Sequence, residues 1–390
     1  LVLDFLRQVS KAMPTLDDSG SRLQSQSKVA LKLADRRKPM KEDGSPATRL
    51  LLFPHNAKHS SSRAIAQVLR TVELMHEALV TGVPTTKRLV DMYYKDVPLF
   101  GSQVVVDKLV DDIAATLSVG RADLNVRASS KGLVSGRGLT MHLYEEDSIT
   151  VSTSESTLIP VSEEIERFEV EDDLSWVLVV EKEAVFQTLC RLNLAEHSRL
   201  PGPGLLITGK GYPDVATRQL VRTLSDNLPA AVPIISLVDC DPWGIDILSV
   251  YKYGSASMVH EHKSLVASRI VWGGVRGEDI SLLGLNKDAM LPITKHDQKK
   301  AMAILRRTDL PGEWKTELQH MLHSRRKAEI EVLSSMSPVL GPQQVFSMES
   351  MQDEDIQHRR NSLLEYTVCI IAKAVDNARR KYATQGRRVV

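Results

Sequence analysis

Three short apolar segments in the second half of the chain each stop abruptly at polar residues or glycines. The segments are residues 176–180, 205–207 and 234–238, and they stop at Glu181, at Thr208-Gly209-Lys210-Gly211 and at Asp239-Cys240-Asp241. A helical pattern follows each one, over residues 182–192, 213–225 and 242–251. Strands that alternate with helices indicate a parallel sheet. The sequence therefore predicts an α/β fold in which the three strand ends lie close together.

The first half of the chain has a different pattern. Residues 14–48 are polar and read as a flexible lead-in. Three helices follow, over about residues 62–79, 87–94 and 106–117, and then a glycine-punctuated hairpin over residues 125–141 with Lys131 and Arg137 near its turn. Three helices and a basic hairpin are typical of a winged helix, a fold that often docks on DNA, and an ordinary helical cap is the alternative.

Charge is unevenly distributed along the 390 residues. Residues 145–173 hold eleven acidic residues and one base, Arg167, which predicts an acidic connector. Elsewhere 49 Lys and Arg residues face 38 Asp and Glu residues, an excess that suits a polyanionic partner. The longest apolar stretch, about residues 229–238, is half the roughly 20 residues of a membrane span. We therefore expect no membrane partner, and a frayed basic tail over residues 376–390.

Carboxylates at two of the strand ends suggest a metal site. Asp239 and Asp241 are two residues apart, so their side chains project the same way from an extended chain, and Glu181 ends a neighbouring strand. Mg²⁺ favours one or two carboxylates completed by water and phosphate. Acids at strand ends also cap helices, which is the alternative for Asp239 and Asp241. The glycines beside Lys210 fit a tight turn, and Lys210 can face a phosphate.

Several segments, in this order, resemble the A-subunit family of topoisomerase VI and, within it, the eukaryotic proteins that make meiotic DNA double-strand breaks. The segments are Lys87-Arg88 with Tyr93-Tyr94-Lys95-Asp96-Val97-Pro98, Ser129-Ser130-Lys131-Gly132, Val180-Glu181-Lys182, Ile207-Thr208-Gly209-Lys210-Gly211, Asp239-Cys240-Asp241-Pro242-Trp243-Gly244 and Lys327-Ala328-Glu329-Ile330-Glu331. The likeness covers about residues 47–333. It implies a winged helix with the nucleophilic tyrosine (49–144) and a Toprim metal-binding domain (174–340). Composition predicts the other parts, which are a flexible segment (1–48), the acidic connector (145–173) and a helical, basic tail (341–390) that is atypical of the family.

The resemblance also implies a function. Tyr94, assisted by Arg88, is expected to attack a DNA phosphate and form a 5′-phosphotyrosyl link, with Mg²⁺ held by Glu181, Asp239 and Asp241. Tyr93 is the alternative nucleophile, but the match over residues 95–100 favours Tyr94. Arg88 stands six residues before Tyr94, where family members carry an arginine four residues before it. At about 100° per residue, this spacing turns Arg88 about 120° out of alignment.

The implied partners are double-stranded DNA, a second copy of the chain, an ATPase like the B-subunit of topoisomerase VI and other meiotic break-forming proteins, in the nucleus. Lys131, Arg137 and Lys210 are the expected DNA-binding residues. Two other functions remain open. A hydrolytic Toprim nuclease would leave protein-free ends, and an inactive homologue would bind DNA without cutting it.

Overall fold

A computed structural model of the chain describes residues 2–12, 28–36, 38, 41, 45–53, 61–82, 85–86, 92–127, 130–144, 147–161, 164–255, 265–283, 290–335 and 351–386. The chain forms two compact units. The first consists of Leu1–Ser129 with Ala256–Glu261, and the second of Ser130–Ser255 with His262–Val390. Each unit has its own hydrophobic core.

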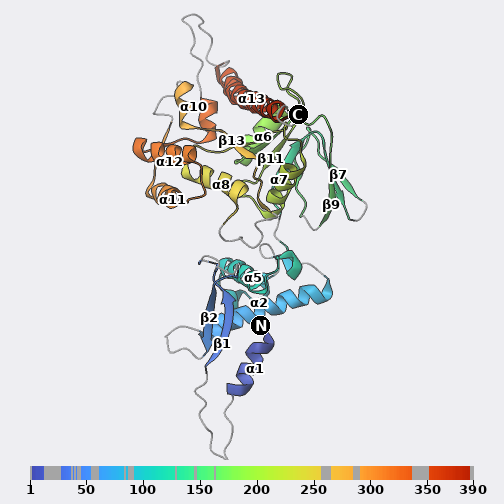
Figure 1. Ribbon diagram of the computed structural model, residues 1–390, viewed down its shortest axis with the longest axis vertical. Coiled ribbons are helices and arrows are strands. Elements are labelled where there is room, and N and C mark those ends of the chain that lie inside the picture. Colours follow the sequence, from blue (N-terminus) through green and yellow to red (C-terminus); the bar gives the residue numbers. More distant parts are fainter. Residues whose placement is uncertain are drawn as a thin grey trace, which may run out of the picture. The chain divides into compact units, whose positions relative to one another are not determined.

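Helices α2 and α5 and a two-stranded sheet build the first unit (Figure 1). The remaining elements are short. Their bounds are α1 (Val2–Ala12), β1 (Val29–Ala34), β2 (Thr48–Phe53), α2 (Ser61–Thr81), β3 (Thr85–Thr86), α3 (Met92–Lys95), α4 (Val97–Phe100), α5 (Gln103–Leu117), η1 (Ala122–Leu124) and β4 (Val126–Arg127). The helices predicted over residues 62–79 and 106–117 are confirmed by α2 and α5. Of the one predicted over residues 87–94, residues 87–91 lie outside the described residues.

The N-terminal lead-in contains regular structure. Strand β1 pairs antiparallel with β2, and Leu31 and Leu33 of β1 are buried in the core of the first unit. The prediction of a flexible segment is therefore wrong for residues 29–34. The burial of alternate leucines on one face gives this strand a packing energy that a polar lead-in would lack.

A six-stranded mixed sheet forms the centre of the second unit, in the order β13-β12-β10-β11-β5-β8. Its strands are β5 (Leu133–Gly136), β8 (Thr157–Leu158), β10 (Trp176–Val180), β11 (Gly204–Thr208), β12 (Ile234–Leu237) and β13 (Ile270–Gly274). The four strands β10 to β13 run parallel, and β10, β11 and β12 are the three that the sequence predicts. Every residue of β10, β11 and β12 is buried, which is typical of a parallel sheet covered on both faces.

Helices join the parallel strands. They are α6 (Glu183–Arg191), α7 (Val215–Asn227) and α8 (Pro242–Tyr253), close to the ranges that the sequence predicts. Figure 1 shows α11 (Lys295–Leu305) and α12 (Gly312–Ser324) on the side of this unit opposite β7 (Ser148–Thr150) and β9 (Ile165–Val170). The shorter elements are η3 (Leu194–Glu196), α10 (Gly277–Leu282), β14 (Leu291–Pro292), β15 (Arg326–Lys327) and η6 (Ile330–Ser335).

The predicted hairpin over residues 125–141 is wrong. Strand β5 pairs with β11 and β8, whereas β6 (Leu139–Leu143) pairs with β7 and β9 in a separate three-stranded sheet. Gly136 and Gly138, both with positive φ, turn the chain from one sheet to the other. The acidic connector accordingly supplies strands β7, β8 and β9 to these sheets.

The C-terminal helix α13 (Met351–Gly386) extends through most of the stretch predicted to fray. Its residues Leu363, Val368, Ile371 and Val375 are buried in the core of the second unit, so tertiary packing holds the helix in place. Among the described residues, no helix is both long and apolar enough to cross a membrane.

Candidate functional site

Glu181 and Asp239 connect the carboxyl ends of β10 and β12. The backbone N–H of Asp239 donates to Glu181 Oε2 at 2.9 Å, and the N–H of Glu181 donates to the Leu237 carbonyl at 3.0 Å. Both carboxyl groups are buried. The parallel sheet therefore brings these two predicted residues together, because neighbouring strands end at the same edge.

Backbone amides hold one oxygen of each aspartate. Asp241 is the N-cap of α8, and its Oδ1 accepts from the N–H groups of Trp243 and Gly244 at 2.8 Å. Asp239 Oδ1 accepts from the N–H of Ile330 at 2.8 Å. The alternative reading of Asp241 as a helix cap is thus correct for one of its two oxygens.

Two lysines lie beside the second oxygen of each aspartate. Lys182 Nζ is 3.2 Å from Asp239 Oδ2 and also pairs with Glu329 at 3.1 Å and Glu331 at 2.7 Å. Lys327 Nζ is 3.5 Å from Asp241 Oδ2 and 3.1 Å from Asp297 Oδ2. Each lysine therefore bridges an aspartate of the strand tip to one or more further acids.

Burial dominates the electrostatics of the strand tip. Together with the nearby charge of Asp239, it raises the pKa of Glu181 to about 8. It also raises the pKa of Asp239 to about 6, although the ammonium of Lys182 acts in the opposite direction. A site where carboxylates are buried close together favours a bound cation, because a cation offsets their mutual repulsion.

The donor set fits Mg²⁺ in part. In the portion of the chain that the structure describes, no group of three Asp, Glu, His or Cys side chains is arranged to hold a metal ion. Mg²⁺ nevertheless requires only one or two carboxylates, with water and phosphate as its other ligands. Asp239 and Asp241, each with one oxygen outside the backbone hydrogen bonds, meet that requirement, and Glu181 lies next to them.

Lys131 and Lys210 lie at the same edge of the sheet. Lys131 precedes β5, whose Leu133 pairs with Thr208 at the carboxyl end of β11. Its Nζ donates to the Lys210 carbonyl at 3.1 Å, and the N–H of Gly211 donates to the Glu181 carbonyl at 2.8 Å. Lys210 Nζ itself pairs with Glu183 at 2.9 Å. The two lysines are thus neighbours of Glu181.

Arg137 lies at the opposite end of the strands, near the amino end of β11. It follows Gly136, which pairs with Leu205 near the amino end of β11. Its guanidinium is 3.6 Å from Glu171 and 3.8 Å from Glu196. The antiparallel direction of β5 therefore separates Arg137 from Lys131 and Lys210, and two acids offset its charge.

Tyr94 lies in the first unit, and the residue is 62% exposed. Tyr93, the alternative, is half-buried against the core of this unit, and the two rings make an edge contact with centroids 5.1 Å apart. Buried Met92 and Phe100 anchor this segment, and the Asp96 side chain accepts from the N–H of Leu99 as the N-cap of α4. Tyr94 is thus the more accessible phenol. Arg88 lies outside the described residues.

Sequence reasoning missed Lys182, Lys327 and Asp297. Asp297 accepts from Trp243 Nε1 at 2.9 Å, and hydrogen bonds from Thr294, Trp243 and Lys327 outweigh its burial and lower its pKa to about 2. Lys182 and Lys327 stand within motifs quoted above, but their pairing with Asp239 and Asp241 joins residues far apart in the sequence. Only the folded chain reveals it.

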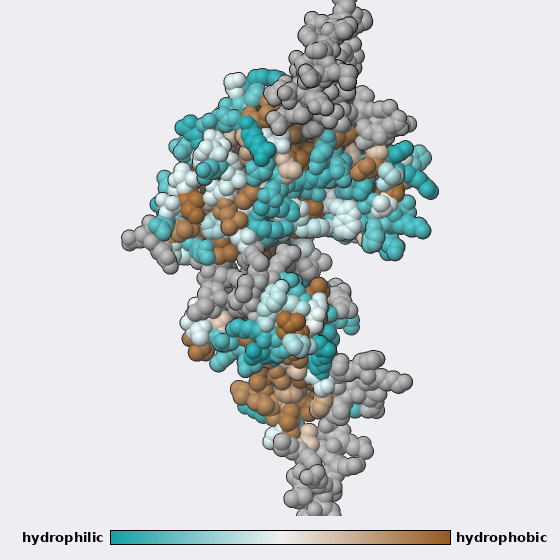
Figure 2. Space-filling view, turned by 180° about the vertical axis from the view of Figure 1, so that it is seen from behind, coloured by the Kyte–Doolittle hydropathy of each residue, from teal (hydrophilic) through white to brown (hydrophobic). Residues whose placement is uncertain are grey.

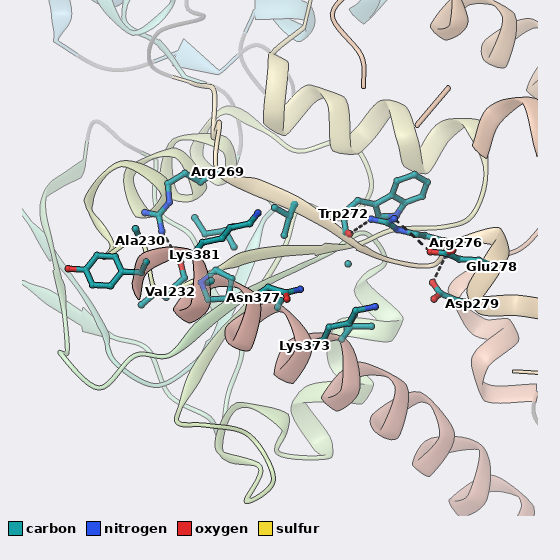
Figure 3. Close-up of a pocket in the computed structure, with 18 residues that line it drawn as sticks. Ala230, Val232, Arg269, Trp272, Arg276, Glu278, Asp279, Lys373, Asn377 and Lys381 are labelled. Atoms are coloured by element: carbon teal, nitrogen blue, oxygen red, sulfur yellow. Dashed lines mark hydrogen bonds and ion pairs between the residues drawn. The ribbon is translucent and has the colours of Figure 1, made fainter. Parts of the chain in front are cut away.

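A cavity of about 560 Å³ lies elsewhere in the second unit, between β13 and α13. Figure 3 shows Lys373, Asn377 and Lys381 of α13 along it, with Trp272 and Arg276 at one end and Arg269 near the other. The Arg269 guanidinium is engaged by the carbonyls of Ser225, Leu228, Pro229 and Val232. None of the predicted site residues that the structure describes lines this cavity, so it is separate from the carboxylate cluster.

Known proteins match both units. Residues 63–126 match the family described as Type IIB DNA topoisomerase, and residues 176–340 match the Toprim domain of the topoisomerase 6 A-subunit/Spo11 family. The chain is 39% identical over 281 residues to "Meiotic recombination protein SPO11" of Mus musculus, covering 71% of this chain and 68% of that protein. It is 36% identical over 342 residues to "Meiotic recombination protein rec12" of Schizosaccharomyces pombe, with 85% and 88% covered. It is 36% identical over 286 residues to the A3 subunit of DNA topoisomerase 6 from Oryza sativa subsp. indica, with 72% and 62% covered.

Proposed function

The chain belongs to the topoisomerase VI A-subunit/Spo11 family, and on that premise we propose that it makes DNA double-strand breaks in meiotic recombination through a covalent link to Tyr94. The observation that carries the proposal is the presence of both an accessible Tyr94 in the first unit and a buried carboxylate cluster in the second. Its setting is the nucleus, where meiotic recombination takes place.

The reaction is a transesterification. The Tyr94 hydroxyl oxygen attacks a backbone phosphorus and loses its proton, the bond from phosphorus to the 3′ oxygen breaks, and that oxygen leaves as a 3′-hydroxyl after gaining a proton. The DNA strand is left attached to Tyr94 through a 5′-phosphotyrosyl bond. No water is consumed. Arg88 is proposed to assist at the phosphate, and Lys131 and Lys210 to contact the DNA backbone.

Glu181, Asp239 and Asp241 are the residues that would hold Mg²⁺. The Toprim domain is generally a metal-binding fold, and Mg²⁺ would stabilise the negative charge that develops on the leaving oxygen. Glu181 orients the Asp239 backbone through the 2.9 Å hydrogen bond. The N-cap bonds of Asp241 fix its Oδ1, so its Oδ2 is the oxygen left for a cation.

Two copies of the chain are proposed to act together, with Tyr94 of one protomer serving the carboxylates of its partner. A heterodimer of one Tyr94→Phe protomer and one Asp241→Asn protomer tests this. If the residues act between protomers, one of the two sites keeps both groups, and DNA is nicked on a single strand. If they act within a protomer, neither site is complete and DNA stays intact.

The nucleophile is tested by purifying the protein from meiotic cells under denaturing conditions and labelling the 3′ ends of attached DNA. We expect label on wild type and on Tyr93→Phe, and none on Tyr94→Phe. Label retained by Tyr94→Phe contradicts the proposal. Breaks with protein-free ends favour hydrolysis, and DNA binding without breaks favours an inactive homologue.

The chain works with other proteins in this family's complexes, and we propose an ATPase like the B-subunit of topoisomerase VI as a partner. Figure 2 shows hydrophobic residues gathered on the first unit. The exposed hydrophobic side chains of that unit include Leu3 and Leu6 of α1 and Leu50 and Phe53 of β2. Such a surface supports contact with another protein.

A further inference from the structure

Asp239 and Asp241 share one arrangement of hydrogen bonds and ion pairs. In each, backbone N–H groups hold Oδ1, from Ile330 for Asp239 and from Trp243 and Gly244 for Asp241. In each, Oδ2 faces a lysine ammonium, Lys182 at 3.2 Å and Lys327 at 3.5 Å. Because Oδ1 already accepts backbone hydrogen bonds, Oδ2 is the oxygen more open to a metal ion, and at Oδ2 the metal ion competes with the lysine.

Each lysine has a second acidic partner at shorter distance. Lys182 Nζ lies 3.1 Å from Glu329 and 2.7 Å from Glu331, whose side chains are 45% and 47% exposed. Lys327 Nζ lies 3.1 Å from the buried Asp297. A lysine that leaves its aspartate therefore keeps an ion pair, so its displacement leaves no buried charge unpaired.

We infer that Lys182 and Lys327 are internal counter-ions that set the Mg²⁺ affinity of this site by exchange. Mg²⁺ takes Oδ2 of each aspartate while Lys182 moves fully onto Glu329 and Glu331, and Lys327 onto Asp297. The inference rests on the proposed metal site and adds its regulation: the two lysines keep the site weak for a cation until DNA phosphate supplies further ligands.

Removing a lysine must then strengthen metal binding. A positive charge within about 4–6 Å lowers the pKa of a carboxylate by about one to three units. It weakens the binding of a metal cation to that carboxylate for the same electrostatic reason. We expect Lys182→Met and Lys327→Met each to bind Mn²⁺, used as the probe for Mg²⁺, on the order of tenfold more tightly in an electron paramagnetic resonance titration. Lys299→Met, which changes an exposed lysine of α11, is the matched control and leaves the affinity unchanged.

A second variant separates exchange from simple electrostatics. Glu331→Gln removes the nearer of the two alternative partners of Lys182 and leaves only Glu329, so Lys182 stays more on Asp239 and Mn²⁺ binding weakens. If Glu331 acts through Lys182, this loss disappears in the Lys182→Met background. A loss of equal size in both backgrounds shows that Glu331 acts only by its own charge, and it overturns the exchange.

The outcomes distinguish the inference from the proposed function. If wild type binds Mn²⁺ clearly and both lysine variants bind it equally or more weakly, the counter-ion role is overturned. The proposed metal site is then still supported. No Mn²⁺ binding by wild type, with or without DNA, overturns the metal site and the exchange with it. Because the expected change is a gain of affinity, a misfolded variant does not imitate it.

Discussion

The hydrogen bond from the Asp239 N–H to Glu181 Oε2, at 2.9 Å, connects the tips of two neighbouring parallel strands. Through it a carboxylate of β10 fixes the backbone that presents the aspartates following β12. Gly244, in the first turn of α8, leaves room for this bond. A Cβ there would lie 3.1 Å from Glu181 Oε2 and would collide with the Asp239 carbonyl.

Replacing Gly244 by alanine is expected to destabilise the protein by about 1–3 kcal/mol, because the added methyl group pushes against backbone in a packed site. Gly312→Ala is the matched control. Nothing lies within 4 Å of a Cβ at Gly312, at the start of α12, so this change is neutral or slightly stabilising. Urea unfolding measures both. Equal stability of the two variants would show that the strand tip accommodates the added methyl group with no loss of unfolding free energy.

Asp241 has a structural role that can be separated from metal binding. Asp241→Ala removes the N-cap of α8 and is expected to cost about 1 kcal/mol, whereas Asp241→Asn retains a capping oxygen and much of this stability. Both variants lose the second carboxylate oxygen and are expected to lose DNA cleavage. Chemical denaturation and a cleavage assay on the same preparations separate the two effects. Full activity of Asp241→Asn would contradict its role as a metal ligand.

The protein is expected to become less stable as the pH rises, because of Glu181. Burial, together with the charge of Asp239, raises its pKa from 4.5 to about 8. A pKa that is higher in the folded state stabilises the fold below the unfolded pKa, and this stabilisation is lost as the pH rises through about 8. The urea midpoint of wild type, measured in chelator, should fall over this window.

Glu181→Gln keeps an acceptor for the Asp239 N–H and has no charge to titrate, so most of the fall should disappear. Glu155→Gln, an exposed change in a loop, serves as the control and should retain the wild-type pH profile. A fall of unchanged size in Glu181→Gln would assign the titration to another group.

Lys210 and Arg137 should differ in their effect on DNA binding. Lys210 lies beside Lys131 and Glu181 at the carboxyl edge of the sheet, whereas Arg137 lies at the other edge with Glu171 and Glu196. Lys210→Ala is expected to weaken binding and to reduce the dependence of log affinity on log salt by about one unit, as for one lost phosphate contact. Arg137→Ala should change neither. Fluorescence anisotropy across a salt series measures both, and the reverse order would place the DNA at the other edge.

Local patterns in the sequence determine the strands, helices and motif residues of the second unit. The buried runs of β10, β11 and β12 each end at the residues that form the site, and the helix after each begins within two residues of its expected start. These features depend on apolar periodicity and on turn and cap residues, which act over a few positions along the chain. The resemblance points to Tyr94 as the proposed nucleophile through the residues that follow it.

Tertiary structure alone decided which side chains meet. The sequence suggested a hairpin that would hold Lys131 and Arg137 close together, but β5 instead joins the central sheet antiparallel to β11, so the two lie at opposite edges. The pairing of Lys182 with Glu331 and of Lys327 with Asp297 likewise joins residues about 150 and 30 positions apart. Short-range preference cannot specify such partners, because sheet order and strand direction follow from the burial of whole faces in the folded chain.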